Sequence, residues 1–204
     1  MPSLLMIVPS RGRPRSVDRL INAWRSTASG HADLVVALDD NDPYLFSYDA
    51  QRVAMVAVGP RQGFVGWTNE LAVRQAANYR FIGSMGDDHR PRTPGWDRML
   101  CQALEELGSG VAYGDDLAQG ERLPSAVTVT SDIVSRLGYL IPPDLSHHGA
   151  GRFWLELGDA LGRTRFVPEV VIEHLHYATG KSPLDPGYLE AAAQVEGDRD
   201  RYEA

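Results

Sequence analysis

Mostly apolar runs alternate with amphipathic stretches along the first 115 residues of the chain. Five runs predict buried β-strands: LLMIVP (4–9), ADLVVAL (32–38), VAMVAV (53–58), YRFIGSM (79–85) and GVAYGDD (110–116). Helices are predicted over 14–28, 67–78 and 95–107. In the first helix Leu20, Ile21 and Trp24 fall on one face. Alternating strands and helices build a mostly parallel sheet flanked by helices, so the pattern predicts an α/β fold.

The pattern is more mixed in the second half of the chain. Strands are predicted over 126–131 and 166–177, and helices over 132–138 and 152–162. In the last of these strands, His174 and His176 lie two residues apart and so project from one face. The tail from residue 186 onward is acidic and helix-prone. We therefore expect a single domain over 1–204, with a mostly parallel central sheet and a mixed C-terminal part.

Composition is that of an ordinary globular protein, because 43% of the 204 residues are hydrophobic and 23% are charged. No uninterrupted apolar stretch reaches the roughly 18 residues of a membrane-spanning helix, so no membrane partner is expected. At the N-terminus the basic residues follow the apolar run, the reverse of a signal peptide. The single cysteine, Cys101, permits no internal disulfide, which favours a cytoplasmic location.

Charge is distributed unevenly on this acidic chain, whose formal net charge is −7. That balance argues against a protein built to coat nucleic acid. Residues 1–30 hold five arginines and one aspartate, a net of +4, whereas 182–204 hold two arginines and six acids, a net of −4. A basic start on an acidic protein predicts one local anion site.

Polar side chains follow the predicted strands where each of them ends. They are Ser10, Arg11 and Arg13 after the first strand, Asp39, Asp40 and Asp42 after the second, Gly63, Gly66 and Asn69 after the third, and Asp87, Asp88 and His89 after the fourth. Ligands of open α/β sheets bind beyond these carboxyl ends. Neighbouring loops of cations and carboxylates suit a ligand with a polar base and metal-bound phosphates.

The segment GDDH (86–89) is the sharpest chemical signal. A carboxylate just beyond a buried strand can hold a divalent cation that bridges phosphate oxygens. Together with His174 and His176 it completes a set suited to octahedral manganese, whereas no cysteine pair supports tetrahedral zinc. VPSRGRP (8–14) lacks the glycine patterns of dinucleotide folds and P-loops, which disfavours a dehydrogenase or an NTPase.

The motifs IVPSRGRP, VVALDDND, GFVGWTNELA, GSMGDDHRP, TPGWD and VIEHLH together resemble a GT-A glycosyltransferase of the compact family-2-like type often encoded by phages. The resemblance spans roughly residues 4–185. It implies a GT-A-like, Rossmann-like domain with a nucleotide-sugar-binding half (1–115), an acceptor-side half (116–185) and an acidic helical tail (186–204). The residues that it assigns to the donor, a UDP-sugar, are Pro9, Ser10, Arg11, Arg13, Asp39, Asn69 and Asp87, with Asp39 at the uracil-like edge.

The resemblance also assigns a metal centre and acceptor contacts. The D-x-D motif of the family falls on residues 86–88, where only its second acid, Asp88, is in register. Asp88 would hold Mn2+ (or Mg2+) with His174 or His176. Trp96, from TPGWD, would stack on the acceptor, and His148 would lie near it.

The implied reaction is displacement at the anomeric carbon of a nucleotide-sugar, in which the metal and arginines offset charge on the leaving diphosphate. An inverting enzyme also needs a carboxylate base. The family supplies it from an E-D-like motif, and the corresponding segment HHGAGRFW has no acid. Asp144, Glu156 and His148 are the nearby candidates, and a retaining mechanism stays open.

Two other functions share this architecture. One is a nucleotide- or carbohydrate-binding module without turnover, which the incomplete D-x-D motif favours. The other is a sugar nucleotidyltransferase. Such enzymes open with a glycine-rich loop, and the segment PSRGRP of this chain matches that loop poorly. Two acceptors are considered, a hydroxymethylated DNA base and a virion protein. Arg90, Arg92 and Arg98, expected to be exposed, would form a local DNA track. The pattern predicts neither the sugar nor the oligomeric state.

Overall fold

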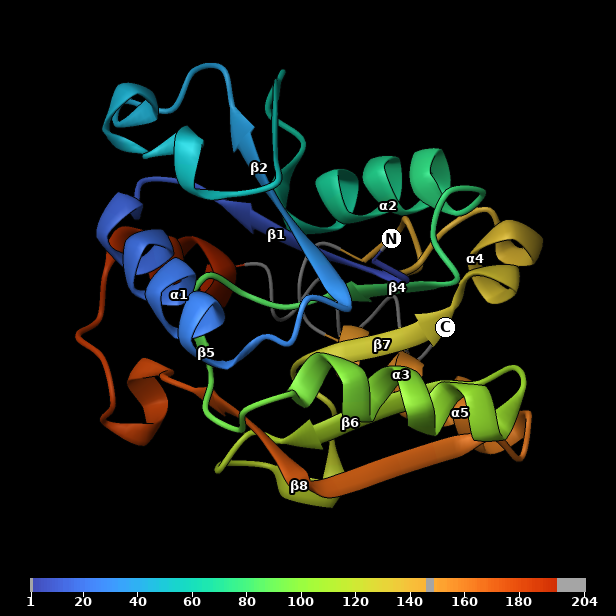
Figure 1. Cartoon of the computed structure of the whole chain (residues 1–204). Coiled ribbons are helices and arrows are strands. Elements are labelled where there is room, and N and C mark those ends of the chain that lie inside the picture. The colour runs from blue at the N-terminus through green and yellow to red at the C-terminus, as the bar shows by residue number, and fades with distance from the viewer. Residues whose placement is uncertain (1, 146–148, 194–204) are drawn as a thin grey trace.

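The computed structural model describes residues 2–145 and 149–193, with the arrangement shown in Figure 1. The strands are β1 (Leu4–Ser10), β2 (Ala32–Asp39), β3 (Met55–Gly59), β4 (Phe81–Ser84), β5 (His89–Pro91), β6 (Val111–Asp115), β7 (Val127–Thr130) and β8 (Thr164–His174). The helices are α1 (Pro14–Thr27), α2 (Gly63–Gln75), α3 (Trp96–Leu107), α4 (Ser131–Leu137) and α5 (Ala150–Ala160), and residues 186–193 are helical as well.

All eight strands belong to one sheet in the order β3-β2-β1-β4-β7-β6-β8-β5. β1 pairs in parallel with β2 and β4, β2 pairs in parallel with β3, and β6 pairs in parallel with β8. β7 runs antiparallel to β4 and β6, and β5 runs antiparallel to β8. The mostly parallel sheet with a mixed C-terminal part is therefore confirmed.

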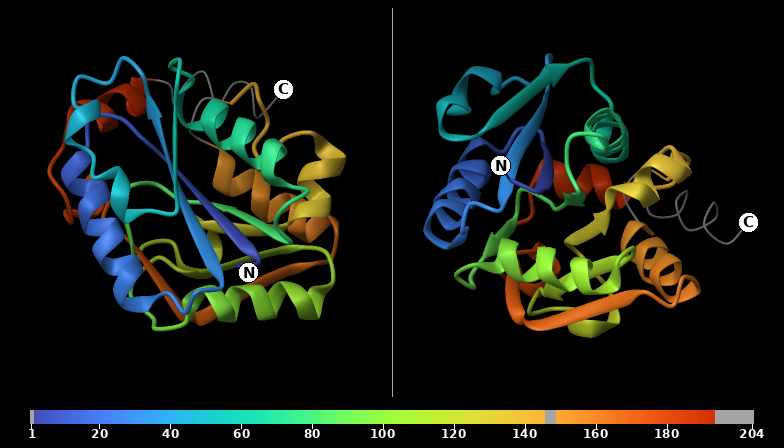
Figure 2. Two further views of the ribbon diagram at one scale, coloured as in Figure 1. Left: turned by 45° about the horizontal axis from the view of Figure 1, so that its top comes forward. Right: turned by 45° about the vertical axis from the view of Figure 1, so that its right-hand side comes forward.

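Both faces of the sheet are covered, which explains the nearly continuous apolar runs of β1 and β2. In β1, Leu4, Met6 and Val8 enter the core under α1 and α3. Leu5 and Ile7 enter the second core, to which α2, α4 and α5 contribute. Figure 2 shows these two helical layers on opposite sides of the sheet. A strand buried on both faces has no alternation of polar and apolar residues, so it reads as one continuous apolar run.

The predicted bounds of two elements were wrong by three residues or more. α2 runs from Gly63 to Gln75 rather than over 67–78, and its first residue, Gly63, has a positive φ of 69°, a conformation that favours glycine. β8 ends at His174 rather than at residue 177. The three-residue strand β5 was not predicted, since HRP has neither length nor apolar character.

The chain direction places the polar strand ends at one edge. β1 ends at Ser10, β2 ends at Asp39, and β8 ends at His174, while the turn carrying Asp88 follows β4. These strands all run in the same direction in the sheet, so their carboxyl ends meet at the edge where α/β proteins bind ligands. No helix in the described part of the chain has the length and apolar character needed to cross a membrane.

Candidate functional site

The turn between β4 and β5 holds Gly86, Asp87 and Asp88. A Cβ atom on Gly86 would come within 2.6 Å of Asp88 Oδ1. Any larger residue would require the Asp88 carboxylate to move. The close approach is a physical reason for a glycine at the position where the D-x-D motif has its first acid.

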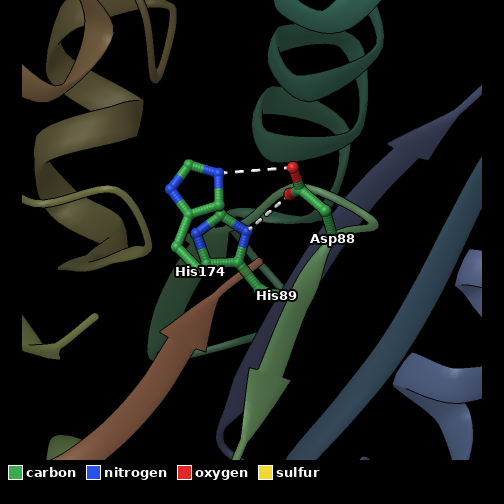
Figure 3. A group of neighbouring side chains, drawn as sticks. All are labelled: Asp88, His89 and His174. Atoms are coloured by element: carbon green, nitrogen blue, oxygen red, sulfur yellow. Dashed lines mark ion pairs between the residues drawn. The ribbon is translucent and has the colours of Figure 1, made fainter. Parts of the chain in front are cut away.

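The carboxylate of Asp88 faces two imidazole rings, as Figure 3 shows. Asp88 Oδ1 lies 3.2 Å from His89 Nδ1, and Asp88 Oδ2 lies 3.3 Å from His174 Nε2. Burial raises the pKa of Asp88, but its contacts with His174 and His89 outweigh burial and hold that pKa well below its usual range. Among the described residues these three side chains form a group of potential metal ligands, with donor atoms within 4.8 Å of one another.

His89 is held from both sides of its ring. The Gly86 N–H donates to His89 Nδ1 at 3.1 Å, and His89 Nε2 lies 3.1 Å from Ser125 Oγ. Its side chain is buried, and burial together with the charge of His174 lowers its pKa. The ring of His89 is therefore held in a fixed orientation. The ring of His174 stacks on it with centroids 4.2 Å apart, and its side chain is 21% exposed, so His174 is the more accessible of the two.

His174 and His176 were both predicted as metal ligands, and the structure separates them. His176 lies beyond the end of β8, where its Nδ1 accepts a hydrogen bond from the Ala178 N–H at 3.2 Å. The two rings remain neighbours, with centroids 5.2 Å apart. His176 is nevertheless outside the group that Asp88, His89 and His174 form. The prediction that His176 projects from the same strand face as His174 was wrong, because β8 ends at His174 and does not include His176.

Asp87 joins the β4 turn to the loop after β1. Its carboxylate accepts hydrogen bonds from Ser10 Oγ at 2.6 Å and from Arg13 NH1 at 3.2 Å. Burial raises the pKa of Asp87 to about 6, although Arg13 opposes the shift and the neighbouring Asp88 adds to it. The predicted donor residues Ser10, Arg13 and Asp87 are thus one connected group. Asp87 therefore orients the guanidinium of Arg13 at this edge of the sheet.

Asp39 is buried at the end of β2, and both of its oxygens have partners. Arg11 NH1 donates to Asp39 Oδ2 at 2.9 Å, and Trp67 Nε1 donates to Asp39 Oδ1 at 2.8 Å. Arg61 Nε lies 3.9 Å from the same Asp39 Oδ2. Arg11, in the loop after β1, and Asp39, at the end of β2, therefore meet at the carboxyl edge of the sheet. Their contact with a nucleobase stays a prediction.

Pro9 and Asn69 lie apart from this hydrogen-bonded group. Pro9 is half-buried in β1, opposite Ala37 of β2. The Asn69 amide binds the chain at 140–141, with its oxygen accepting from both backbone N–H groups at 2.9 Å and its nitrogen donating to the Ile141 carbonyl at 2.7 Å. A donor contact for either residue stays a prediction.

The predicted acceptor role of Trp96 is wrong. The side chain is completely buried in the core, where it packs edge-on against Trp24 with ring centroids 5.0 Å apart. No face is left for a sugar. The neighbouring Asp97 accepts hydrogen bonds from the backbone N–H groups of Ser29 and His31, so the TPGWD segment fastens the loop between α1 and β2.

The proposed bases lie in the α4–α5 region. Asp144 is exposed in the loop that precedes α5. Glu156 is exposed on α5 and accepts a hydrogen bond from Arg152 Nε at 2.7 Å. His148, predicted as an acceptor contact, lies outside the described residues. No position of a base relative to an acceptor follows from these placements.

The exposed arginine track predicted for DNA is also wrong in part. Arg90 is 5% exposed and donates to the carbonyls of Asp87 and His89, and to Ser16 Oγ. Arg92 is exposed, but Glu173 accepts hydrogen bonds from its Nε and NH2. Hence Arg90 supports the β4 turn from inside the protein, because its guanidinium satisfies backbone carbonyls there.

Sequence reasoning missed three contributors to this edge, namely Ser125, Tyr188 and Arg61. Tyr188 donates from its hydroxyl to Asp88 Oδ2 at 2.7 Å and is 6% exposed. It belongs to the acidic tail, whose pattern predicts only a helix. No local signal in the sequence links these residues to Asp88, Asp39 or His89, since each contact joins distant segments.

The fold is similar to that of several solved structures. S. aureus TarS in complex with UDP-GlcNAc matches with a TM-score of 0.66 and 13% identity, over 84% of this chain and 57% of that one. Mannosyltransferase PcManGT from Pyrobaculum calidifontis, in complex with GDP-Man and Mn2+, matches with a TM-score of 0.62 and 14% identity, over 92% and 67%. The CMP:2-keto-3-deoxy-manno-octonic acid synthetase complexed with CTP matches with a TM-score of 0.55 and 14% identity, over 82% and 91%.

These likenesses establish a GT-A-like fold. Another TarS structure is much longer than this chain, which spans 36% of it. No protein-family model matches the sequence, and no curated protein matches it either.

Proposed function

We propose that this protein is a glycosyltransferase that moves a sugar from a nucleotide-sugar, a UDP-sugar in the first instance, to an acceptor hydroxyl with the help of a divalent cation. The observation that carries the proposal is the meeting of Asp88 Oδ2 and His174 Nε2, 3.3 Å apart, at the ligand-binding edge of this sheet. The solved structures with the same fold support it, since TarS was determined with UDP-GlcNAc and PcManGT with GDP-Man and Mn2+.

The donor set suits a cation such as Mn2+. One carboxylate and two imidazoles gather their donor atoms within 4.8 Å, and manganese accepts both ligand types. Gly86 leaves the space that the Asp88 carboxylate needs. Asp88 and the accessible His174 would hold the ion, while the ring of His89, stacked on that of His174, keeps His174 in place. When bound, the ion offsets negative charge on the leaving diphosphate.

Residues of the protein itself bind the donor at its phosphates and at its base. Arg13 donates to phosphate oxygens, because its guanidinium is fixed by Asp87 and carries a permanent charge. Asp39, oriented by Arg11, accepts from the N–H of the base. Residues 1–115 would thus bind the donor, and 116–185 would form the acceptor side.

The acceptor hydroxyl must lose a proton to a base. Asp144 and Glu156, both exposed, are the candidates for this role in the described part of the chain. Of Asp144→Asn and Glu156→Gln, the substitution that removes the base would lower transfer while leaving nucleotide binding unchanged, and the other is the matched comparison. Cys101, buried and without a disulfide, fits action in the cytoplasm.

The test combines binding with turnover. UDP or GDP with Mn2+, at about 100 times Kd, should raise the melting temperature by roughly 5–10 °C. Incubation with UDP-GlcNAc, UDP-glucose or GDP-mannose should release the nucleoside diphosphate slowly even without an acceptor, and EDTA should stop the release. Binding without release would identify a binding module instead. Consumption of a nucleoside triphosphate would identify a nucleotidyltransferase, and no response to any nucleotide would refute the proposal.

A further inference from the structure

The segment 182–190 lies directly on the proposed donor site. Figure 1 shows this part of the chain, in red, beside α1. Its Tyr188 hydroxyl donates to Asp88 Oδ2 at 2.7 Å, the same oxygen that faces His174 Nε2. Ser182 Oγ lies 3.0 Å from that hydroxyl and supports it. One coordination direction of the Asp88 carboxylate is therefore taken by the protein itself.

A first carboxylate of the segment binds Arg13. Arg13 NH2 donates to Asp185 Oδ1 at 2.5 Å, while its NH1 remains on Asp87. The guanidinium also lies 4.0 Å from the centre of the Tyr188 ring. A Cβ on Gly187 would stand 3.1 Å from Arg13 Nε, so a glycine lets the segment approach this closely.

A second carboxylate binds Arg61. Glu190 accepts a hydrogen bond from Arg61 NH2, and Arg61 Nε lies 3.9 Å from Asp39 Oδ2. The two acids of the segment thus engage two arginines, one paired with Asp87 and the other beside Asp39. A nucleoside diphosphate presents its negative charge to the same kind of partner, because guanidinium groups bind phosphate and carboxylate oxygens in the same manner.

We propose, resting on the donor site argued above, that segment 182–190 is a built-in competitor of the nucleoside diphosphate. Asp185 and Glu190 stand where phosphate oxygens would bind Arg13 and Arg61. The Tyr188 hydroxyl stands where the cation would approach Asp88. Donor binding then displaces the segment and exchanges its carboxylates for phosphate oxygens. The same argument makes Arg61 a donor-binding residue.

The exchange is energetically accessible. The arginine of each pair remains partly exposed, with side-chain exposures of 17% for Arg13 and 43% for Arg61. Partly exposed ion pairs stabilise weakly, so a diphosphate with a divalent cation outcompetes them. The net charge of +4 on residues 1–30 and the two carboxylates of the segment, Asp185 and Glu190, favour the closed arrangement without ligand.

The first test measures the Kd of UDP and of GDP with Mn2+ by calorimetry on the full chain. The double variant Asp185→Asn/Glu190→Gln keeps the shapes of both side chains, and Asn also replaces Asp well at the start of the helix over 186–193. We expect a Kd about three- to tenfold lower than in the unmodified protein.

The matched control is Glu105→Gln/Glu106→Gln on α3, which changes the net charge equally. Its acids pair with Arg80 and Arg165 rather than with the arginines of the donor site. If the two double variants bind the nucleotide with the same Kd, within twofold, the competitor is refuted while the donor site stands. If no nucleotide binds to any of the proteins, the donor site and the competitor are both refuted.

A second measurement follows the segment directly. Lys181 is the only lysine in the chain and directly precedes the segment, so a lysine-specific endoproteinase cuts at one place. In the folded protein Lys181 Nζ is paired with Glu173 at 3.0 Å. UDP with Mn2+ should speed this cleavage severalfold, because the segment leaves the site. Slower cleavage would show that the segment closes over the bound donor, and this would overturn the proposal.

Discussion

His89 and His174 are direct cross-strand partners in the antiparallel pair β5–β8, and their rings stack with centroids 4.2 Å apart and planes at 14°. This pairing unites the two halves of the site, since Asp88 directly precedes His89 and His174 is the last residue of β8. Leu175 N also donates to the Asp88 carbonyl at 3.0 Å, which extends the pairing by one step. A strand of three residues thereby sets the position of the candidate metal ligands.

Asp88→Asn tests the metal centre. The amide keeps the size of the side chain but removes the charge that a divalent cation needs. We expect the part of the UDP-induced rise in melting temperature that depends on Mn2+ to disappear, while the melting temperature without ligand changes by no more than a few degrees. Glu106→Gln on α3 serves as the charge-matched control. An Mn2+ effect of normal size in Asp88→Asn would place the ion elsewhere.

Gly86→Ala tests the space beneath the carboxylate. The added Cβ would stand 2.6 Å from Asp88 Oδ1, so Asp88 must move. Mn2+ affinity, measured by calorimetry with UDP present, should fall at least tenfold. In the Asp88→Asn background the same change should cost no further affinity, because the two substitutions act on one contact. Independent, additive losses would contradict this reading of the turn.

Trp96→Ala tests whether this tryptophan belongs to the core or to the acceptor site. Because the ring is completely buried against Trp24, its loss should lower the free energy of unfolding by about 3–5 kcal/mol. Urea denaturation measures this loss, and the Kd of UDP at low temperature should be unchanged. If Trp96→Ala kept normal stability but lost sugar transfer, the prediction that Trp96 contacts the acceptor would be supported.

Asn69→Ala distinguishes a structural from a donor-binding asparagine. Its oxygen accepts from the N–H groups of Leu140 and Ile141, and both residues are buried. Leaving these groups without an acceptor should lower the free energy of unfolding by about 2–4 kcal/mol. The Kd of UDP should change less than twofold. A large loss of UDP affinity with normal stability would support the predicted donor contact.

Asp97→Asn should show a pH-dependent loss of stability. Burial raises the pKa of Asp97, but hydrogen bonds from Ser29 and His31 outweigh burial and lower it below its usual value. A lowered carboxyl pKa stabilises the fold above the unfolded-state pKa, about 3.9, and this stabilisation is lost as the pH falls through the folded-state pKa. Urea denaturation should therefore show a difference of about 1–3 kcal/mol between the two proteins at pH 7.

The same difference should shrink as the pH falls below about 4, where Asp97 of the unfolded chain becomes neutral first, and it should vanish once the folded-state Asp97 is neutral as well. Asp132→Asn, another carboxylate with a lowered pKa but much less buried, is the comparison and should show a smaller difference at pH 7. A difference for Asp97→Asn that stayed constant from pH 7 to pH 3 would mean that the carboxylate charge contributes nothing.

Much of the architecture follows from local patterns. Apolar runs such as 4–9 and 32–38 predict buried parallel strands, because a strand covered on both faces tolerates no polar position. The polar residues at their ends, Asp39 and Asp88 among them, could be assigned to one edge, since the carboxyl ends of parallel strands meet there. The sequence alone therefore determined the α/β class and the edge of the sheet at which Asp39 and Asp88 lie, while their role in a binding site stays a prediction.

Only the tertiary structure decided which side chains meet at that edge. The exclusion of His176 depends on where β8 stops, and the stacking of His89 on His174 depends on the register of a strand too short to be predicted. Trp96 was misassigned because burial is set by packing against Trp24, which no spacing in the sequence reveals. The contact of Tyr188 with Asp88 likewise joins distant segments, and such contacts are decided by the balance of packing and charge in the folded chain.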